Sequence, residues 1–119
     1  RNIILSNNIM DRIDFGSAEK GGAFTITESG EIIISNCQII NPRFRGIHLV
    51  NSDNVRISQC MIYESAHISN MLTGIELKGS CSGTLVKDNS ISNGKTGEII
   101  NHASGAIIDR NVSIIKKPK

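Results

Sequence analysis

The chain has 119 residues, with 13 Lys and Arg against 11 Asp and Glu, so its formal net charge is only +2. A charge this small gives no argument for nucleic acid or an anionic membrane as a partner. No apolar run approaches the length of a membrane span, so we expect no membrane-spanning segment. The length suits one domain, and the many isoleucines with few aromatic residues favour sheets over a helical bundle.

One short pattern recurs along the whole chain, in which two or three apolar residues are followed by polar ones. The copies are residues 3–8, 32–37, 55–60, 84–89 and 106–111, and their last residues are spaced 29, 23, 29 and 22 apart. A second pattern lies between them, clearest at 46–52 and 74–80 and weaker at 23–29. Its fourth copy, near 97–101, can be aligned in two registers one residue apart.

Within a copy the apolar residues alternate with polar ones, as Ile47, His48 and Leu49 do, which is the period of a β-strand. Turn-forming residues interrupt the strands at 51–54 and near Pro42. Three short strands and three turns in about 23 residues make one coil, and coils stack at about 4.8 Å. We therefore predict one all-β domain over residues 1–119, a single-stranded parallel β-helix (a solenoid) of about five coils. A leucine-rich repeat would need a regular leucine pattern, and a β-sandwich would need no recurring position.

The last residue of the first pattern should form a column at one bend of the coils. Its members are Asn8, Cys37, Cys60, Asn89 and Asn111. Stacked asparagine amides can hydrogen-bond along the axis, and cysteine is a small, buried substitute. Disulfide geometry is demanding and the Cβ vectors of Cys37 and Cys60 would be parallel, so we expect free thiols. Cys81 falls in a turn and has no predicted partner.

The string Gly46-Ile-His-Leu-Val-Asn-Ser-Asp-Asn-Val-Arg-Ile-Ser-Gln-Cys-Met-Ile62 resembles the repeat of the pectate-lyase-like right-handed parallel β-helix superfamily. Its members include pectate lyases, polygalacturonases, alginate epimerases and lyases, and phage tailspike depolymerases. The resemblance implies a right-handed coil, a polysaccharide ligand along one long face, and an extracellular or virion-associated location. The carboxylate-rich motifs of polygalacturonases and the calcium-binding Asp clusters of pectate lyases are not visible, which argues against both of those activities. We expect no metal site and no cofactor.

The coil lengths alternate because one link alternates. The links at 10–23 and 62–74 are long, and those at 41–45 and 92–96 are short. We expect two long arms that project from the same edge, two coils apart. The first arm carries Asp11, Arg12, Asp14, Glu19 and Lys20, and the second carries Glu64 and His67. Such charges either serve a function or are ordinary solvated loop residues.

The candidate catalytic residues are His48 and Glu76, which should stack outward with Thr25 on successive coils. A histidine beside a carboxylate can transfer protons, although a surface ion pair explains the same pattern. The candidate substrate-binding residues are Arg43, Arg45 and Arg56, a basic cluster suited to carboxylates or sulfates of a glycan. The alternative is a solvated basic face.

An apolar column is expected on the outer face of the other strand, formed by Ile4, Ile33, Arg56, Leu85 and Ile107. A stripe of this kind needs cover from the chain's own loops, from further polypeptide or from a second chain. Trimeric tailspikes pack β-helices side by side, so the resemblance implies a homo-oligomer such as a trimer. Solenoid ends also need caps, so we expect a piece of a larger chain.

Two functions stay open. The first is a polysaccharide-binding or polysaccharide-degrading segment, tailspike-like, which as an enzyme would be a glycoside hydrolase or a polysaccharide lyase. The second is a non-catalytic β-helix shaft or oligomerisation module. The partners expected are a polysaccharide and either further copies or the rest of a larger chain.

Overall fold

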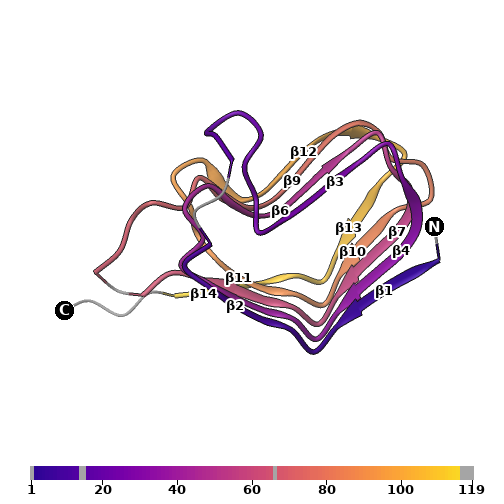
Figure 1. Cartoon of the computed structure of the whole chain (residues 1–119). Coiled ribbons are helices and arrows are strands. Elements are labelled where there is room, and N and C mark those ends of the chain that lie inside the picture. Colours follow the sequence, from indigo (N-terminus) through magenta and orange to yellow (C-terminus); the bar gives the residue numbers. More distant parts are fainter. Residues whose placement is uncertain (1, 14–15, 66, 116–119) are drawn as a thin grey trace.

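Three parallel sheets wind around one core in a coiled chain (Figure 1). The computed structural model describes residues 2–13, 16–65 and 67–115, and all regular elements within these ranges are β-strands. Sheet 1 contains β1 (Ile3–Ser6), β4 (Gly30–Ser35), β7 (Asp53–Ser58), β10 (Leu85–Lys87) and β13 (Ile107–Asp109). Sheet 2 contains β2 (Ile9–Asp11), β5 (Gln38–Ile40), β8 (Met61–Tyr63), β11 (Ser90–Ser92) and β14 (Val112–Ile114). Sheet 3 contains β3 (Phe24–Thr27), β6 (Arg45–Val50), β9 (Thr73–Ser80) and β12 (Gly97–Ser104).

Each strand pairs in parallel with its copy in the next coil, so the parallel β-helix predicted from the repeat is confirmed. The number of coils is slightly smaller than predicted. Sheets 1 and 2 have five strands but sheet 3 has four, which gives four complete coils and two strands of a fifth. The reason is that the fifth copy of the first pattern is followed by only one further strand among the described residues. No helix in this part of the chain is long and apolar enough to cross a membrane.

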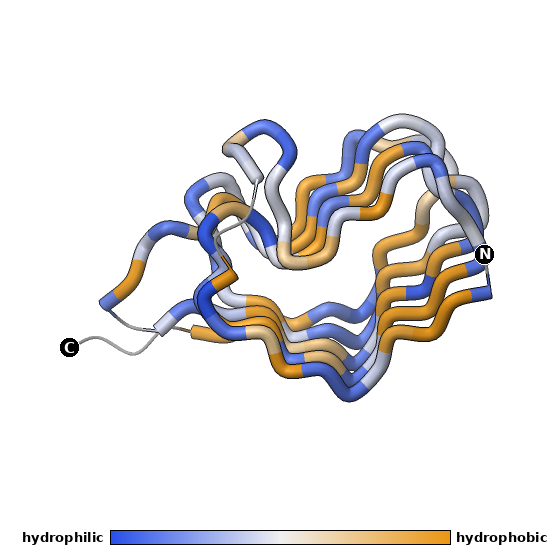
Figure 2. The backbone as a smooth tube through the Cα atoms, in the orientation of Figure 1, coloured by the Kyte–Doolittle hydropathy of each residue, from blue (hydrophilic) through white to orange (hydrophobic). Residues whose placement is uncertain are grey.

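Apolar side chains alternate inward along each strand and stack into columns between coils. In sheet 1 the inward column is Leu5, Ile34, Ile57, Val86 and Ile108. Its middle members are fully buried, and the corresponding residues of sheet 2 are Ile39, Ile62 and Ile91. Figure 2 shows hydrophobic positions recurring at the same place in successive coils. The core is thus a stack of aliphatic layers, as the period of two requires.

The bend between sheets 1 and 2 repeats one backbone conformation in every coil. Its residues are Asn7, Asn36, Gln59, Asp88 and Arg110, all with φ between 49° and 58°. Left-handed backbone is tolerated best by Gly, Asn and Asp, which accounts for the residues of the first, second and fourth bends; the third and fifth bends place Gln59 and Arg110 in the same conformation. Because all five bends turn alike, the two sheets keep one register from coil to coil.

The predicted ladder lies immediately after this bend. The Asn89 amide donates to the backbone oxygen of Ile57 at 3.0 Å and to Asn111 Oδ1 at 2.9 Å, while its own Oδ1 accepts from the Cys60 backbone N–H at 2.9 Å. Cys37, Cys60 and Cys81 are free, buried thiols, as predicted for the first two. Burial raises the pKa of the Cys60 thiol to about 11.

The alternation of long and short links is confirmed. The links between sheets 2 and 3 cover 12–23, 41–44, 64–72 and 93–96. Figure 1 shows both long arms leaving this edge, but the first rises beside the outer face of sheet 3 and the second extends away from the coils. The first arm, residues 12–23, includes Asp14, which lies outside the described residues.

The apolar column on the outer face of sheet 1 is also confirmed. Ile4, Ile33, Arg56, Leu85 and Ile107 are paired in register across the five strands. Ile4 is 68% exposed and Ile107 62% exposed. The described arms leave from the opposite edge of the coil, between sheets 2 and 3, so they do not cover this column along its length (Figure 1).

Candidate functional site

The outer face of sheet 3 carries two columns, each of three polar residues and one apolar residue. The first is Thr25, His48, Glu76 and Ile100, and the second is Thr27, Val50, Lys78 and His102. The predicted stacking of Thr25, His48 and Glu76 is therefore confirmed as a register. This face, together with the first arm, forms the groove described next.

A groove of about 410 Å³ lies between the first arm and sheet 3. It is lined by Glu19, Lys20, Thr25, Thr27, His48, Val50 and Lys78, and we call it the sheet-3 groove. The arm makes a tight turn in which the Gly21 N–H donates to the Ser17 oxygen at 2.6 Å. Gly16, with φ of 95°, passes so close that an added β-carbon would lie 2.7 Å from Gly21 Cα. The compact turn therefore requires glycine and places Glu19 and Lys20 as one wall.

His48 is 3% exposed and sits in the floor of this groove. Its Nδ1 lies 3.2 Å from the carbonyl oxygen of Lys20. A carbonyl only accepts hydrogen bonds, so Nδ1 carries the hydrogen and Nε2 of the neutral ring is an acceptor. Among the described residues Nε2 is the one buried side-chain nitrogen or oxygen without a hydrogen-bond partner. Burial lowers the pKa of His48 below 6.5, which favours this neutral form at neutral pH.

Glu76 lies opposite His48 but contacts other groups. Arg45 Nε donates to Glu76 Oε1 at 2.7 Å, and Lys78 Nζ lies 3.2 Å from Glu76 Oε2. Burial alone would raise the pKa of Glu76, but the hydrogen bonds from Arg45 and Lys78 outweigh it and hold the pKa below 4.5. Glu76 is therefore an ionised carboxylate at neutral pH, chemically able to accept a proton and poorly suited to donate one.

The three candidate arginines do not form one cluster. Arg45 is buried and spans Glu76 and the Gly21 oxygen, which its NH1 reaches at 3.1 Å. Arg43 is exposed in the short link 41–44, with its guanidinium 5.0 Å from the centroid of the Phe44 ring. Arg56 lies on the outer face of sheet 1, between Ile33 and Leu85. Sequence order placed them together, but the turn between β6 and β7 sends Arg56 to another sheet.

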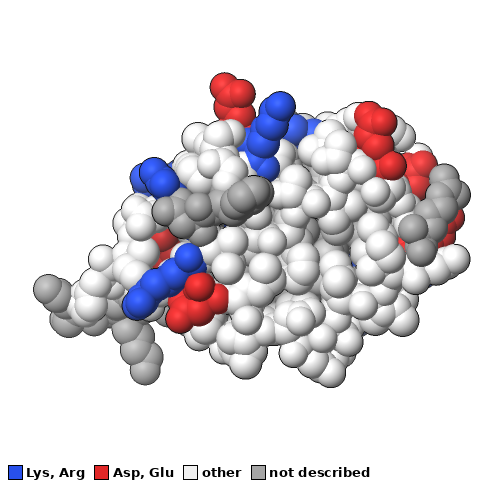
Figure 3. All heavy atoms as spheres, in the orientation of Figure 1, with Lys and Arg blue, Asp and Glu red and all other residues white. Residues whose placement is uncertain are grey.

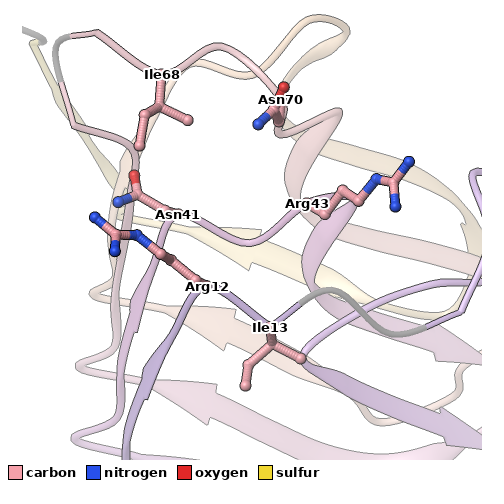
Figure 4. A pocket seen from close by; sticks show the side chains of 6 residues that line it. All are labelled: Arg12, Ile13, Asn41, Arg43, Ile68 and Asn70. Carbon is pink, nitrogen blue, oxygen red and sulfur yellow. The ribbon is translucent and has the colours of Figure 1, made fainter.

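A second opening lies between the two arms. It has a volume of about 410 Å³ and is lined by Arg12, Ile13, Asn41, Arg43, Ile68 and Asn70. Figure 4 shows the Arg12 and Arg43 guanidinium groups pointing away from each other, so they do not converge on one point. Glu64 fixes the second arm, because its Oε2 accepts from the backbone N–H groups of Asn70 and Met71 at 2.6 and 2.7 Å. His67 of the same arm is exposed.

Sequence reasoning missed Thr27, Val50 and Lys78 as neighbours of His48. The alternation along a strand could have identified them, because residues two apart on a strand lie on the same face of the sheet. The three residues occupy the next outward position on β3, β6 and β9. No pattern in the sequence predicts that the first arm folds back over sheet 3. Figure 3 shows that charges gather at the margin of the face seen along the coil axis, which is otherwise largely uncharged. In the part of the chain that the structure describes, no group of three or more His, Cys, Asp or Glu is placed to hold a metal ion.

Comparison with known proteins agrees with this architecture. Residues 22–114 match the family described as "Right handed beta helix region". Comparisons with curated proteins and with solved structures gave no match. The matched segment covers more than three quarters of the chain and includes β3 to β14. The chain therefore belongs to the right-handed β-helix family.

Proposed function

We propose that this chain is a polysaccharide-binding β-helix segment and that the sheet-3 groove is its binding site. The observation that carries the proposal is the sheet-3 groove itself, an open hollow of about 410 Å³ in which charged and hydroxyl side chains of the first arm and of sheet 3 converge. Binding residues are often carried by loops that a rigid scaffold holds in place, and a groove lined by a few convergent polar groups is a typical ligand site.

The lining of the groove suits a sugar. Thr25 and Thr27 supply hydroxyl groups, Lys20 and Lys78 supply ammonium groups, and Val50 supplies a small apolar patch. Sugar rings present hydroxyl groups that donate and accept together with apolar C–H faces, so a mixed lining complements them. The similarity to tailspike and pectate-lyase repeats adds the expectation of a bacterial or acidic polysaccharide.

The test is retention of the protein on immobilised polysaccharides, both neutral and acidic. We expect one class to retain the wild-type chain and to retain Lys78→Met clearly less, because that substitution removes an exposed ammonium group from the groove. Lys87→Met on sheet 1 is the matched control, because it removes a lysine distant from the groove. Equal retention of all three proteins, or none of any, would contradict the proposal.

Cleavage of the bound glycan would use His48 and Glu76 as the acid/base pair, in a hydrolase or a lyase. The ion pairs of Glu76 favour binding without turnover, because a general acid must hold a proton near neutral pH. Incubation with the retained polysaccharide should give neither new reducing ends nor unsaturated products. Either product would establish the enzymatic alternative, and its loss in Glu76→Gln would assign the residue.

A second candidate function is side-by-side oligomerisation through sheet 1. It is favoured by the outward column on the five strands of sheet 1, in which Ile4, Ile33 and Ile107 are exposed and Leu85 is half-buried, with Arg56 between Ile33 and Leu85. Sedimentation should then show a homo-oligomer, such as a trimer, that dissociates in Ile33→Asp. A stable monomer over a wide concentration range would refute this candidate and leave the binding proposal intact.

A further inference from the structure

Residues 16–22 of the first arm form a loop that is fastened to the outer face of sheet 3 through its backbone. Two side chains of β6 donate to it. Arg45 Nη1 donates to the Gly21 oxygen at 3.1 Å, and His48 Nδ1 donates to the Lys20 oxygen at 3.2 Å. The ring of His48 is therefore part of the surface on which the 16–22 loop rests.

The 16–22 loop contributes little to the core. Residues 16–20 are exposed, and no side chain of the loop belongs to the hydrophobic core. Gly22 lies against the sheet, since an added β-carbon would stand 3.3 Å from His48 Cβ. A segment with few buried apolar contacts opens at a lower free energy than the core strands. The loop can therefore leave sheet 3 while the coils remain folded.

The His48 ring has no place for a second proton while the loop is closed. Nδ1 already carries a hydrogen and donates it to Lys20, and Nε2 is buried without a hydrogen-bond partner among the described residues. A proton on Nε2 would create a buried N–H without an acceptor, together with a buried positive charge. Burial is also the main reason why the pKa of His48 lies below 6.5.

The charged groups that face His48 come from its own strand, from β9 and from the loop. They are Arg45, Glu76, Lys78, Glu19 and Lys20. Arg45 and Lys78 oppose a positive ring, whereas Glu76 favours one. Glu76 is held by Arg45 at 2.7 Å and by Lys78 at 3.2 Å, so a new bond to His48 would compete with both ion pairs. The strand on the other side, β3, contributes Thr25 and Thr27, which carry no charge.

We propose that the 16–22 loop is a latch, closed over sheet 3 while His48 is neutral and released when the ring takes a second proton. Release lets water reach the ring, which removes the cost of a buried charge. Because the loop supplies Glu19 and Lys20, release also removes one wall of the sheet-3 groove. Binding in the groove then depends on pH. This last step rests on the proposed function, whereas the latch itself does not.

The direction of the effect follows from the linkage between protonation and closure. In the closed state the pKa of His48 lies below 6.5, and in the open state the solvated ring has its usual pKa. Closure is therefore fully favoured above pH 6.5 and weakens as the pH falls through the closed-state pKa. Between the two values the ratio of open to closed molecules should rise roughly tenfold for each pH unit.

The position of the loop can be followed by NMR with a nitroxide label on Ala18→Cys. Ala18 is exposed, and the three native thiols are buried, so the label goes to the loop alone. At pH 8 the label should broaden the amide resonances of Thr25 and Val50, which line the same groove as the loop. Between pH 8 and pH 4 this broadening should decline as the His48 ring takes up its proton. A label on Ser69→Cys of the second arm is the control and should give no such change.

Two variants test the role of the ring. His48→Asn keeps a nitrogen donor on the same side-chain carbon that carries Nδ1 but cannot take up a proton, so its loop should stay closed at low pH. His102→Asn is the matched control, because it removes an exposed imidazole from β12 of the same sheet. It should follow the wild-type chain. Release at the same pH in His48→Asn and in the wild-type chain would overturn the latch.

The wild-type chain decides the matter even if His48→Asn does not fold. Constant broadening while His48 takes up its proton would overturn the latch, as would a ring and a loop that are both unchanged down to pH 4. Loss of the broadening together with all folded resonances would overturn it too, since the opening would then be global.

Retention on an immobilised polysaccharide at pH 8 and at pH 5 completes the experiment. We expect retention at pH 8 and its loss at pH 5 in the wild-type chain, and retention at both in His48→Asn. Equal retention by an open loop would overturn the dependence of the groove on the latch. If a polysaccharide is retained but the loop never opens, the latch fails and the proposed function stands. If the loop opens and nothing is retained at either pH, the proposed function fails and the latch stands.

Discussion

His48 and Glu76 are directly opposed on β6 and β9, yet each side chain is held by a different part of the molecule. His48 is anchored to the first arm through the Lys20 carbonyl, and Glu76 is anchored to its own sheet through Arg45 and Lys78. Arg45 also contacts the Gly21 carbonyl of the arm. One buried guanidinium therefore contributes both to the position of the arm and to the ionisation of Glu76.

The first prediction concerns that guanidinium. Arg45→Met should lower the free energy of unfolding by about 3 kcal/mol, because it leaves the buried Glu76 carboxylate with a half-exposed lysine as its remaining charged contact. Lys78→Met is the matched control and should cost less than about 1 kcal/mol, since the ammonium is partly solvated. Urea unfolding followed by circular dichroism measures both. Similar losses in the two variants would show that the Arg45 pair is not structurally dominant.

The second prediction is a pH dependence of stability. The folded-state pKa of His48 lies below 6.5, so the unfolded chain binds the proton more tightly. The contribution of neutral His48 is therefore complete above pH 6.5 and is lost as the pH falls through the folded-state pKa. Glu76, with its pKa below 4.5, adds a second loss at lower pH as its carboxylate is protonated. Thermal unfolding should be measured between pH 8 and pH 3. The His48→Gln variant should lack the loss of stability that begins near pH 6.5 and should keep the loss at lower pH that is due to Glu76.

The third prediction concerns the asparagine ladder. Asn89→Ala should destabilise the fold by about 2–3 kcal/mol, because it leaves the Cys60 N–H and the Ile57 oxygen without their side-chain partners inside the core. Asn8→Ala is the control. Asn8 stands in the same column of the first coil and is exposed, and its side-chain amide lies 3.9 Å from Cys37 Sγ, which is a weak acceptor. Equal losses in the free energy of unfolding for the two substitutions would show that the inner asparagines contribute no more to stability than the outer one.

The fourth prediction concerns thiol reactivity. With its pKa near 11, Cys60 is a thiolate in about one molecule in a thousand at pH 8, and all three cysteines are buried. The folded protein should therefore react with Ellman's reagent only as fast as it unfolds, whereas urea should release all three thiols at once. Ser69→Cys, at an exposed position of the second arm, should add one fast-reacting thiol. Rapid reaction of the wild-type chain would contradict the described burial.

Much of the fold could be predicted because the repeat itself fixes the register. Aligning Cys37 with Cys60 places Ile33 beside Arg56, and aligning Gly46 with Gly74 places His48 beside Glu76; the structure has both pairs. The number of coils was overestimated slightly, because a copy of the first pattern does not guarantee that all three strands follow it.

The candidate site could be predicted only in part. A column gives the neighbours of a side chain across the sheet, but it does not say which neighbour binds it. Glu76 forms ion pairs with Arg45 and Lys78. His48 forms a hydrogen bond with a backbone carbonyl of the first arm, and the path of that arm could not be predicted because its sequence is not repeated. Arg56 was grouped with Arg45 because the two are close in sequence. That inference fails where a tight turn leads the chain from one sheet into the next, as it does between β6 and β7.

The unequal links between sheets 2 and 3 show where this architecture accepts added length. The chain inserts 12–23 or 64–72 at this corner while the bend between sheets 1 and 2 keeps its left-handed residue in every coil. Extra residues here leave the stacking of the sheets unchanged, since they enter and leave at one edge. The short links 41–44 and 93–96 are therefore natural places to graft new loops without redesigning the core.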